Sequence, residues 1–197
     1  MKGTISQPKV SDIPNNLVSR LLKLKLGTHY LIIYPNIETV RKIYAQYIRV
    51  LLEENRVAIL FFPYYDTTDK VRQELTLKGI DVKKYERDNS LTLVDFAKVI
   101  DNPYLGIPAA FGLKEFVSKI KRFHSKKTLI VITDMSLYNH LGDIDDLLKY
   151  ESFGHHGSEA LNWKQICLYH KLDFNLMFTS KQKQKIFDYH KDKIIEI

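Results

Sequence analysis

Short apolar runs alternate with amphipathic helical segments along this 197-residue chain. The runs at 30–34, 57–62 and 128–133 are almost continuously apolar, which is typical of strands that are buried on both faces of a parallel sheet. The segment 37–51 repeats apolar residues at helical spacing. The alternation predicts an α/β fold, with a mostly parallel sheet flanked by helices on both faces.

The remaining segments predict further elements of the same fold. We expect residues 1–25 to form a polar tail with a short helix, and residues 26–197 to form a single domain. Thr179 and Gln182 form a predicted capping box, and the Gly154–Gly157 segment is a predicted flexible turn. Additional strands are predicted at 82–85, 91–94, 164–170 and 193–197, and helices at 13–26, 68–78, 113–123, 143–150 and 180–190.

The junction between the first strand and the first long helix lacks a phosphate-binding loop. It has the sequence Pro35-Asn36-Ile37-Glu38-Thr39, whereas nucleotide-binding α/β proteins carry a glycine-rich loop there with Lys and Ser or Thr at its end. Some ATPases with this strand–helix arrangement also place a catalytic glutamate after the second strand, where this chain has Tyr64, Tyr65 and Asp66. A phenol with a pKa of about 10 cannot replace that base at neutral pH. We therefore predict no catalytic residue and no cofactor.

Candidate binding residues come from the strand ends, because ligands of parallel sheets bind beyond the carboxyl ends of the strands. The segments concerned are 34–38, 63–67, 134–136 and 170–173. Alternatives stay open for individual residues: Asp134 could hold magnesium or cap the next loop, and Asp66 could belong to a helix entry. The predicted ligand-binding residues are His29, Tyr34, Tyr65, Asp66, Asp134 and Ser136.

No metal site is expected from residue spacing. His155 and His156 are adjacent in a glycine-rich segment, and His190 has no partner at ligand spacing. Cys167 is the single cysteine, so an intramolecular disulfide is excluded, and its apolar neighbours predict a buried thiol.

Charge and hydropathy restrict the partners. The net charge is +7, carried by scattered lysines, so nucleic-acid binding is open but not favoured. No apolar run approaches the roughly 18 residues of a membrane span, and we expect a cytoplasmic protein without a membrane partner.

Several segments resemble the MEDS family, the methanogen/methylotroph sensory domain of prokaryotic regulators. They are GTHYLIIY at 27–34, GIDV at 79–82, LTLVD at 91–95, CLYH at 167–170 and the closing segment 190–197. The resemblance covers about 26–197. It implies a degenerate RecA/KaiC-like three-layer sandwich without a functional P-loop. Many members have Cys two residues after the opening His, whereas this chain has Leu31 there, so a His/Cys site on the first strand is not expected.

Three functional hypotheses follow. The first, implied by the resemblance, is a non-catalytic sensor of a small molecule, such as a hydrocarbon derivative. It would act in prokaryotic, by expectation archaeal, signalling or transcriptional control through a separate regulator or kinase. The second is a nucleotide-binding or residual ATPase module that uses magnesium and Asp134. The third is a basic accessory protein that binds nucleic acid with strong salt dependence. An oligomer is compatible with each of them.

Overall fold

The structure is a computed structural model that describes residues 13–54, 56–95, 127–136, 138, 144–161, 163–191 and 193–197. The predicted helix at 113–123 lies outside the described residues. The described strands form a six-stranded sheet in the order β3-β2-β4-β5-β1-β6, and every neighbouring pair is parallel. This confirms the predicted parallel α/β fold. The strands are β1 (Thr28–Tyr34), β2 (Val57–Phe62), β3 (Leu91–Leu93), β4 (Thr128–Asp134), β5 (Lys164–His170) and β6 (Ile194–Glu196).

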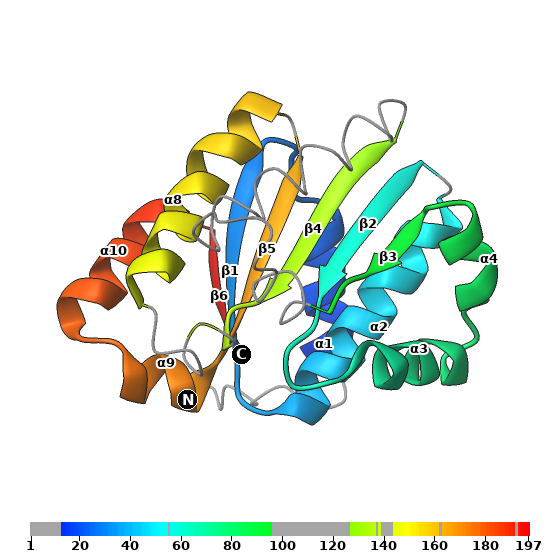
Figure 1. Ribbon diagram of the computed structural model, residues 1–197, viewed down its shortest axis with the longest axis horizontal. Coiled ribbons are helices and arrows are strands. Elements are labelled where there is room, and N and C mark those ends of the chain that lie inside the picture. The colour runs from blue at the N-terminus through cyan, green and yellow to red at the C-terminus, as the bar shows by residue number, and fades with distance from the viewer. Residues whose placement is uncertain are drawn as a thin grey trace, which may run out of the picture.

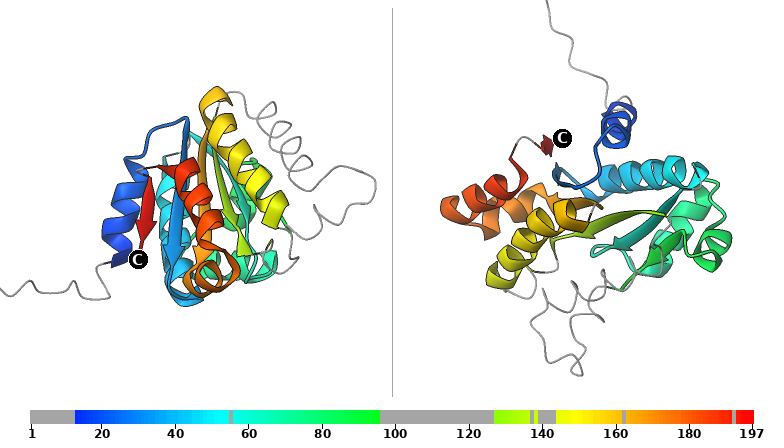
Figure 2. Two further views of the ribbon diagram at one scale, coloured as in Figure 1. Left: turned by 90° about the vertical axis from the view of Figure 1, so that its left-hand side faces the viewer. Right: turned by 90° about the horizontal axis from the view of Figure 1, so that it is seen from above.

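Helices cover both faces of the sheet, so the domain has three layers (Figure 1). Seen from above, α1 and α2 lie on one side of the sheet and α8 on the other (Figure 2). The core is accordingly divided in two, with side chains of α1, α2 and α3 in one half and those of α8, α9 and α10 in the other. The helices are α1 (Ile13–Leu22), α2 (Ile37–Glu53), α3 (Thr68–Leu77), α4 (Val82–Arg87), α8 (Ile144–Leu161), α9 (Lys171–Met177) and α10 (Ser180–His190).

Strand β1 is buried along its whole length and sends alternate side chains into the two halves of the core. Ile32 and Tyr34 pack with α2, whereas Leu31 and Ile33 pack in the half that contains α8. Residues that are an odd number of positions apart on β1 therefore lie on opposite faces, which decides which side chains can share a site.

The connection from β1 to α2 consists of only Pro35 and Asn36. The Asn36 side chain caps α2 by accepting a hydrogen bond from the Thr39 amide at 2.9 Å. At the start of α10, the predicted capping box is confirmed, since Thr179 and Gln182 bond each other's backbone amides. The connection after β1 is thus a short capped turn in place of a phosphate loop.

Two local predictions are wrong. Residues 82–85 form the first turn of α4, because the Asp81 side chain accepts a hydrogen bond from the Lys84 amide and caps a helix there. The Gly154–Gly157 segment lies inside α8. A Cβ atom on Gly154 would lie 2.8 Å from ring atoms of His29, so this glycine serves close packing.

Candidate functional site

The carboxyl edge of the sheet, at the bottom of Figure 1, brings three of the predicted residues into contact. Tyr34 and Asp134 end strands that lie on either side of β5. The Tyr34 hydroxyl reaches across this gap and donates a hydrogen bond of 3.0 Å to Asp134 Oδ2. The Ser136 amide donates to Asp134 Oδ1 at 3.1 Å. Both oxygens of this carboxyl are therefore fixed in place.

Asp134 is a buried carboxyl with an unusual environment. Asp134 is only 5% exposed, and no Lys or Arg of the described residues forms an ion pair with it. Burial raises the pKa of Asp134 to about 6, because the charged form loses its hydration, although the hydrogen bonds from Ser136 and Tyr34 oppose this shift. The carboxyl can therefore change its protonation state near neutral pH.

Tyr65 forms the outer wall of the same site. Its hydroxyl donates to Asp173 Oδ2 on α9, and its ring contacts those of His170 and Tyr64 at centroid distances of 5.6 and 5.0 Å. Tyr65 is 37% exposed, which makes it the most exposed of these three aromatic residues. His170 ends β5 and Asp173 lies in the first turn of α9, within the segment 170–173 that the sequence predicted to border a ligand.

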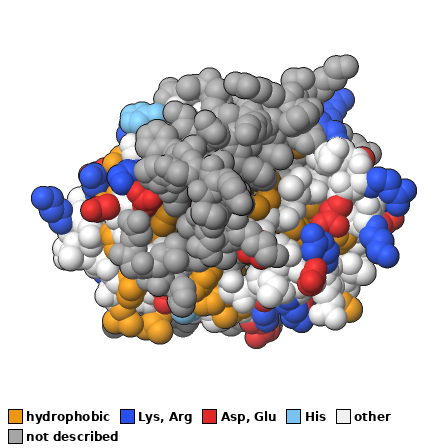
Figure 3. All heavy atoms as spheres, viewed as in Figure 1, with side chains coloured by type: hydrophobic (Ala, Val, Ile, Leu, Met, Phe, Trp, Pro, Cys, Tyr) orange, Lys and Arg blue, Asp and Glu red, His pale blue; other side chains and the backbone are white. Residues whose placement is uncertain are grey.

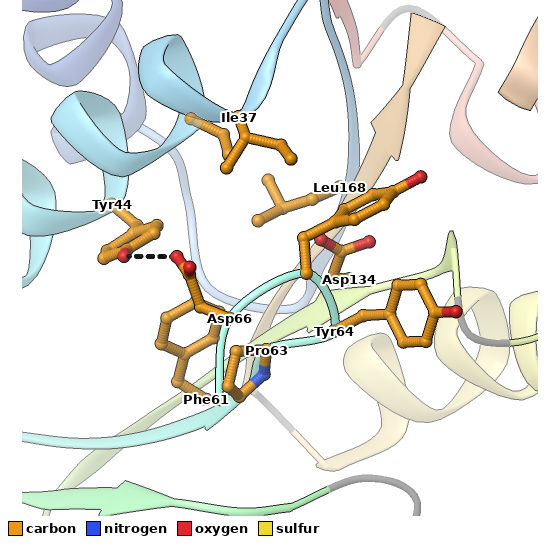
Figure 4. A pocket seen from close by; sticks show the side chains of 10 residues that line it. Ile37, Tyr44, Phe61, Pro63, Tyr64, Asp66, Asp134 and Leu168 are labelled. Carbon is orange, nitrogen blue, oxygen red and sulfur yellow. Dashed lines mark hydrogen bonds between the residues drawn. The ribbon is translucent and has the colours of Figure 1, made fainter. Parts of the chain in front are cut away.

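A narrow pocket lies between these residues and α2 (Figure 4). Its empty volume is about 250 Å³ with the open mouth included, but its enclosed part has room for about one water molecule. Figure 4 shows the Asp134 carboxyl below Leu168 and Ile37. The apolar part of the wall includes Ile37, Phe61, Pro63 and Leu168.

Asp66 lines the same pocket but is engaged in a structural contact. Both of its oxygens bind the Arg41 guanidinium, at 2.9 and 2.5 Å, and Oδ2 also accepts from the Tyr44 hydroxyl at 3.2 Å. Figure 4 shows Asp66 turned towards Tyr44 and away from Asp134. Asp66 thus fastens the loop after β2 to α2, and Thr67 is the residue that caps α3.

The structure separates His29 from the other predicted ligand-binding residues. His29 is five positions before Tyr34 on β1, about 16 Å along the strand, and on the opposite face of the sheet. There His29 Nε2 lies 3.1 Å from Cys167 Sγ, 3.0 Å from Glu151 Oε2 and 3.1 Å from His190 Nε2. The expectation that His190 has no partner is wrong, since this contact joins residues 161 positions apart. Cys167 is fully buried, as predicted.

Burial keeps the histidines of this second group neutral. It lowers the pKa of His29 to about 3 and that of His190 to about 4, and it raises the pKa of Glu151. Sequence spacing gave no signal for Glu151, because α8 reaches the sheet only through tertiary packing. The sequence feature that could have indicated this packing is the pair of glycines in α8, because Gly154 lets the helix lie close to His29 and Gln165 on the sheet.

The comparisons with known proteins agree with this fold. The profile of the MEDS domain, described as the methanogen/methylotroph, DcmR sensory domain, matches residues 28–182. The chain belongs to the MEDS family. This match covers most of the described sheet and both groups of residues except His190, and it places the domain in a family that is described as sensory. No curated protein matches the chain.

Two solved structures show the fold of this MEDS domain in other proteins. A KaiC-like protein of the hyperthermophilic archaeon Pyrococcus horikoshii is 16% identical, with a TM-score of 0.59 over 82% of this chain and 70% of that one. An uncharacterized P. horikoshii protein, solved with an unknown peptide, is 15% identical, with a TM-score of 0.65 over 92% and 82% of the two chains. At these identities the likeness establishes the RecA/KaiC-like three-layer fold.

On the described part of the face in Figure 3, Lys and Arg side chains are interspersed with Asp and Glu. Cations of α2 pair along their own helix, as Lys42 does with Glu38 and Arg49 with Glu53. Within the described part of the chain, no helix combines the length and the apolar character that crossing a membrane requires.

Proposed function

We propose that this MEDS domain is a non-catalytic sensor that binds a small hydrocarbon derivative at the carboxyl edge of its sheet. The observation that carries the proposal is Asp134, a buried carboxyl that Tyr34 and Ser136 hold at an apolar pocket. A small ligand would place its carbon atoms against Ile37 and its polar group towards Asp134. Its output, through a separate regulator or kinase in signalling or transcriptional control, belongs to the same proposal.

The start of α2 supports a non-catalytic role. In a nucleotide-binding relative, the first amides of this helix would hold phosphate. Here Asn36 already satisfies the Thr39 amide, and the two-residue connection from β1 leaves no loop to surround a phosphate group. Asp134 remains at the end of β4, but no phosphate-binding residue faces it from this turn.

The charge of the site favours an amine over a neutral ligand. A buried carboxylate without a cationic partner is costly, and a bound ammonium group would remove that cost. Tyr64 and Tyr65 add aromatic rings beside the carboxyl, which can stabilise an organic cation. The enclosed space admits about one water-sized group, so methylammonium would place its ammonium group there and its methyl group towards the open mouth, and a larger ligand requires Tyr65 to move.

Tyr65 provides a route from binding to response. It joins the loop after β2 to α9 through Asp173 and rests on His170 at the end of β5. A ligand that displaces the Tyr65 ring would break this connection. It would favour a second arrangement of α9 to the extent that it binds that arrangement more tightly than the first.

The test is a set of NMR titrations of the ¹⁵N-labelled chain with methylammonium, methanol and ATP-magnesium as separate probes. We expect methylammonium to shift the amide signals of residues 134–136 and 64–66 most strongly, and Asp134→Asn to abolish the shifts. Asp188→Asn, which changes an exposed carboxylate on α10, is the matched control and should leave them intact. Shifts with ATP-magnesium alone, or equal shifts in Asp134→Asn, would refute the proposal.

A further inference from the structure

Four side chains from four different elements meet between the sheet and α8. They are His29 of β1, Glu151 of α8, Cys167 of β5 and His190 of α10, and we call them the His29 cluster. All four residues are at most 2% exposed. The helices that supply two of them, α8 and α10, pack on each other and on β1 (Figure 1).

The donor atoms of the His29 cluster converge on a common centre. Nε2 of both histidines, a Glu151 oxygen and Cys167 Sγ lie within 4.8 Å of one another. Four of the six separations between these atoms are 3.0–3.4 Å, and the two between Cys167 Sγ and the atoms of Glu151 and His190 are at most 4.8 Å. A tetrahedron with zinc bonds of about 2.0–2.3 Å has edges of roughly 3.3–3.8 Å, so small side-chain shifts would bring the four atoms to that geometry. Glu151 Oε2 has no hydrogen-bond partner within the described part of the chain, although it is buried and lies 3.0 and 3.4 Å from the two imidazoles.

Neighbouring groups orient three of the four ligand atoms. His190 Nδ1 donates to the Ile186 carbonyl at 2.7 Å, which leaves the Nε2 lone pair of the neutral ring directed into the cluster. The Tyr169 hydroxyl donates to Glu151 Oε1, so that Oε2 is the oxygen left for the centre. The Gln165 side chain donates to Cys167 Sγ at 3.5 Å. His29 Nδ1 has no partner among the described residues.

Charge balance also fits a divalent ion. A thiolate and a carboxylate together carry two negative charges, and two neutral imidazoles add none. One Zn²⁺ therefore makes the whole group neutral, which is the condition under which ionised side chains can be buried in a core. The mixture of one sulfur, two nitrogens and one oxygen suits zinc better than magnesium or calcium, which prefer oxygen alone.

We propose that His29, Glu151, Cys167 and His190 bind one Zn²⁺ ion in a closed tetrahedral site. Four protein ligands leave no open position, so the role is structural: the ion fastens α8 and α10 to β1 and β5. Since the site is closed, the ion enters as the chain folds, and binding contributes to folding stability. The site lies on the sheet face opposite to the Tyr34–Asp134 contact and is independent of the proposed sensor function.

The test uses the full chain, refolded from denaturant under reducing conditions with Zn²⁺, with Co²⁺ or without metal. We expect about one metal ion per chain after removal of excess metal, and a higher melting temperature with metal than without. The Co²⁺ form should show the intense visible bands of tetrahedral coordination and a thiolate charge-transfer band. Failure of the wild-type chain to retain Zn²⁺ or Co²⁺ overturns the proposal without reference to any variant.

Variants assign the ligands. Cys167→Ser should abolish the charge-transfer band, and Tyr169→Phe should weaken metal binding about tenfold to a hundredfold, since it removes only the support of Glu151. His156→Ala changes an exposed histidine of α8, the helix that carries Glu151. It is the matched control, and we expect it to leave metal binding unchanged. A Co²⁺ spectrum that Cys167→Ser leaves intact, or that His156→Ala removes, would place the metal elsewhere. In either case the methylammonium titration still tests the sensor proposal separately.

Discussion

Gly154 allows α8 to lie directly on the polar side chains of the sheet, and Gly154→Ala measures how tightly they are packed. A Cβ atom at this position would lie 2.8 Å from Gln165 Nε2 and from two ring atoms of His29, whereas ordinary contacts are 3.4–4 Å. Both neighbours are at most 2% exposed. His29 is surrounded by Cys167 and its other cluster partners, so the ring cannot simply swing into solvent.

Two opposing contributions give the expected magnitude. Replacing Gly by Ala inside a helix favours folding by about 1 kcal/mol, because Gly loses more backbone freedom. Overpacking a core by one methyl group disfavours folding by about 1–3 kcal/mol. With a gap about 0.6 Å or more too short and two confined neighbours, the steric cost should dominate. We expect Gly154→Ala to lower the free energy of unfolding by about 1–2 kcal/mol.

Gly157→Ala is the matched control, three residues later in the same helix. The three nearest atoms to its Cβ atom would belong to the Phe153 ring, the closest at 2.9 Å, and this half-buried side chain can shift. Gly157→Ala should therefore leave stability unchanged or raise it by up to about 1 kcal/mol. Urea denaturation followed by circular dichroism measures both variants under identical metal conditions. The packing argument is refuted if Gly154→Ala is as stable as Gly157→Ala.

Two further predictions concern the carboxyl edge. In the folded chain the pKa of Asp134 is about 6, above the ordinary 3.8, so folding favours the protonated carboxyl. The folded state keeps its full stability below about pH 4, and it loses stability as the pH rises through 6 and Asp134 ionises. The Asn side chain of Asp134→Asn does not titrate. The free energy of unfolding of this variant should therefore rise relative to that of the wild type by up to about 3 kcal/mol between pH 4 and 7, which urea titrations at several pH values measure. A difference between the two proteins that does not change with pH would contradict the raised pKa. Asp66→Ala should lower the free energy of unfolding by about 1–3 kcal/mol, because it removes a bidentate partner of Arg41 and an acceptor for Tyr44, whereas Asp69→Ala, at a carboxyl whose side chain is 91% exposed, should change it by less than about 1 kcal/mol. Equal effects of the two alanine variants in thermal denaturation would show that the Arg41 pair is not structural.

The sequence by itself determined the architecture and the short turn that replaces a phosphate loop. Continuous apolar runs marked β1, β2 and β4, because strands buried on both faces need no polar positions. The capping box at Thr179 and the turn at Asn36 were equally readable, since a cap depends on residues within one helical turn. These features depend on local periodicity and local hydrogen bonds, which a single sequence contains in full.

Only the tertiary structure decided which distant residues meet. It brought Tyr34 and Asp134 together across β5 and sent His29 to the opposite face, because side chains alternate along a strand. It also placed His190 beside His29, and it made Gly154 part of a helix where local composition predicted a turn. The physical reason is the same in each case: the packing of α8 and α10 on the sheet is set by contacts between segments far apart in the chain, and these contacts override local preference when they bury enough surface.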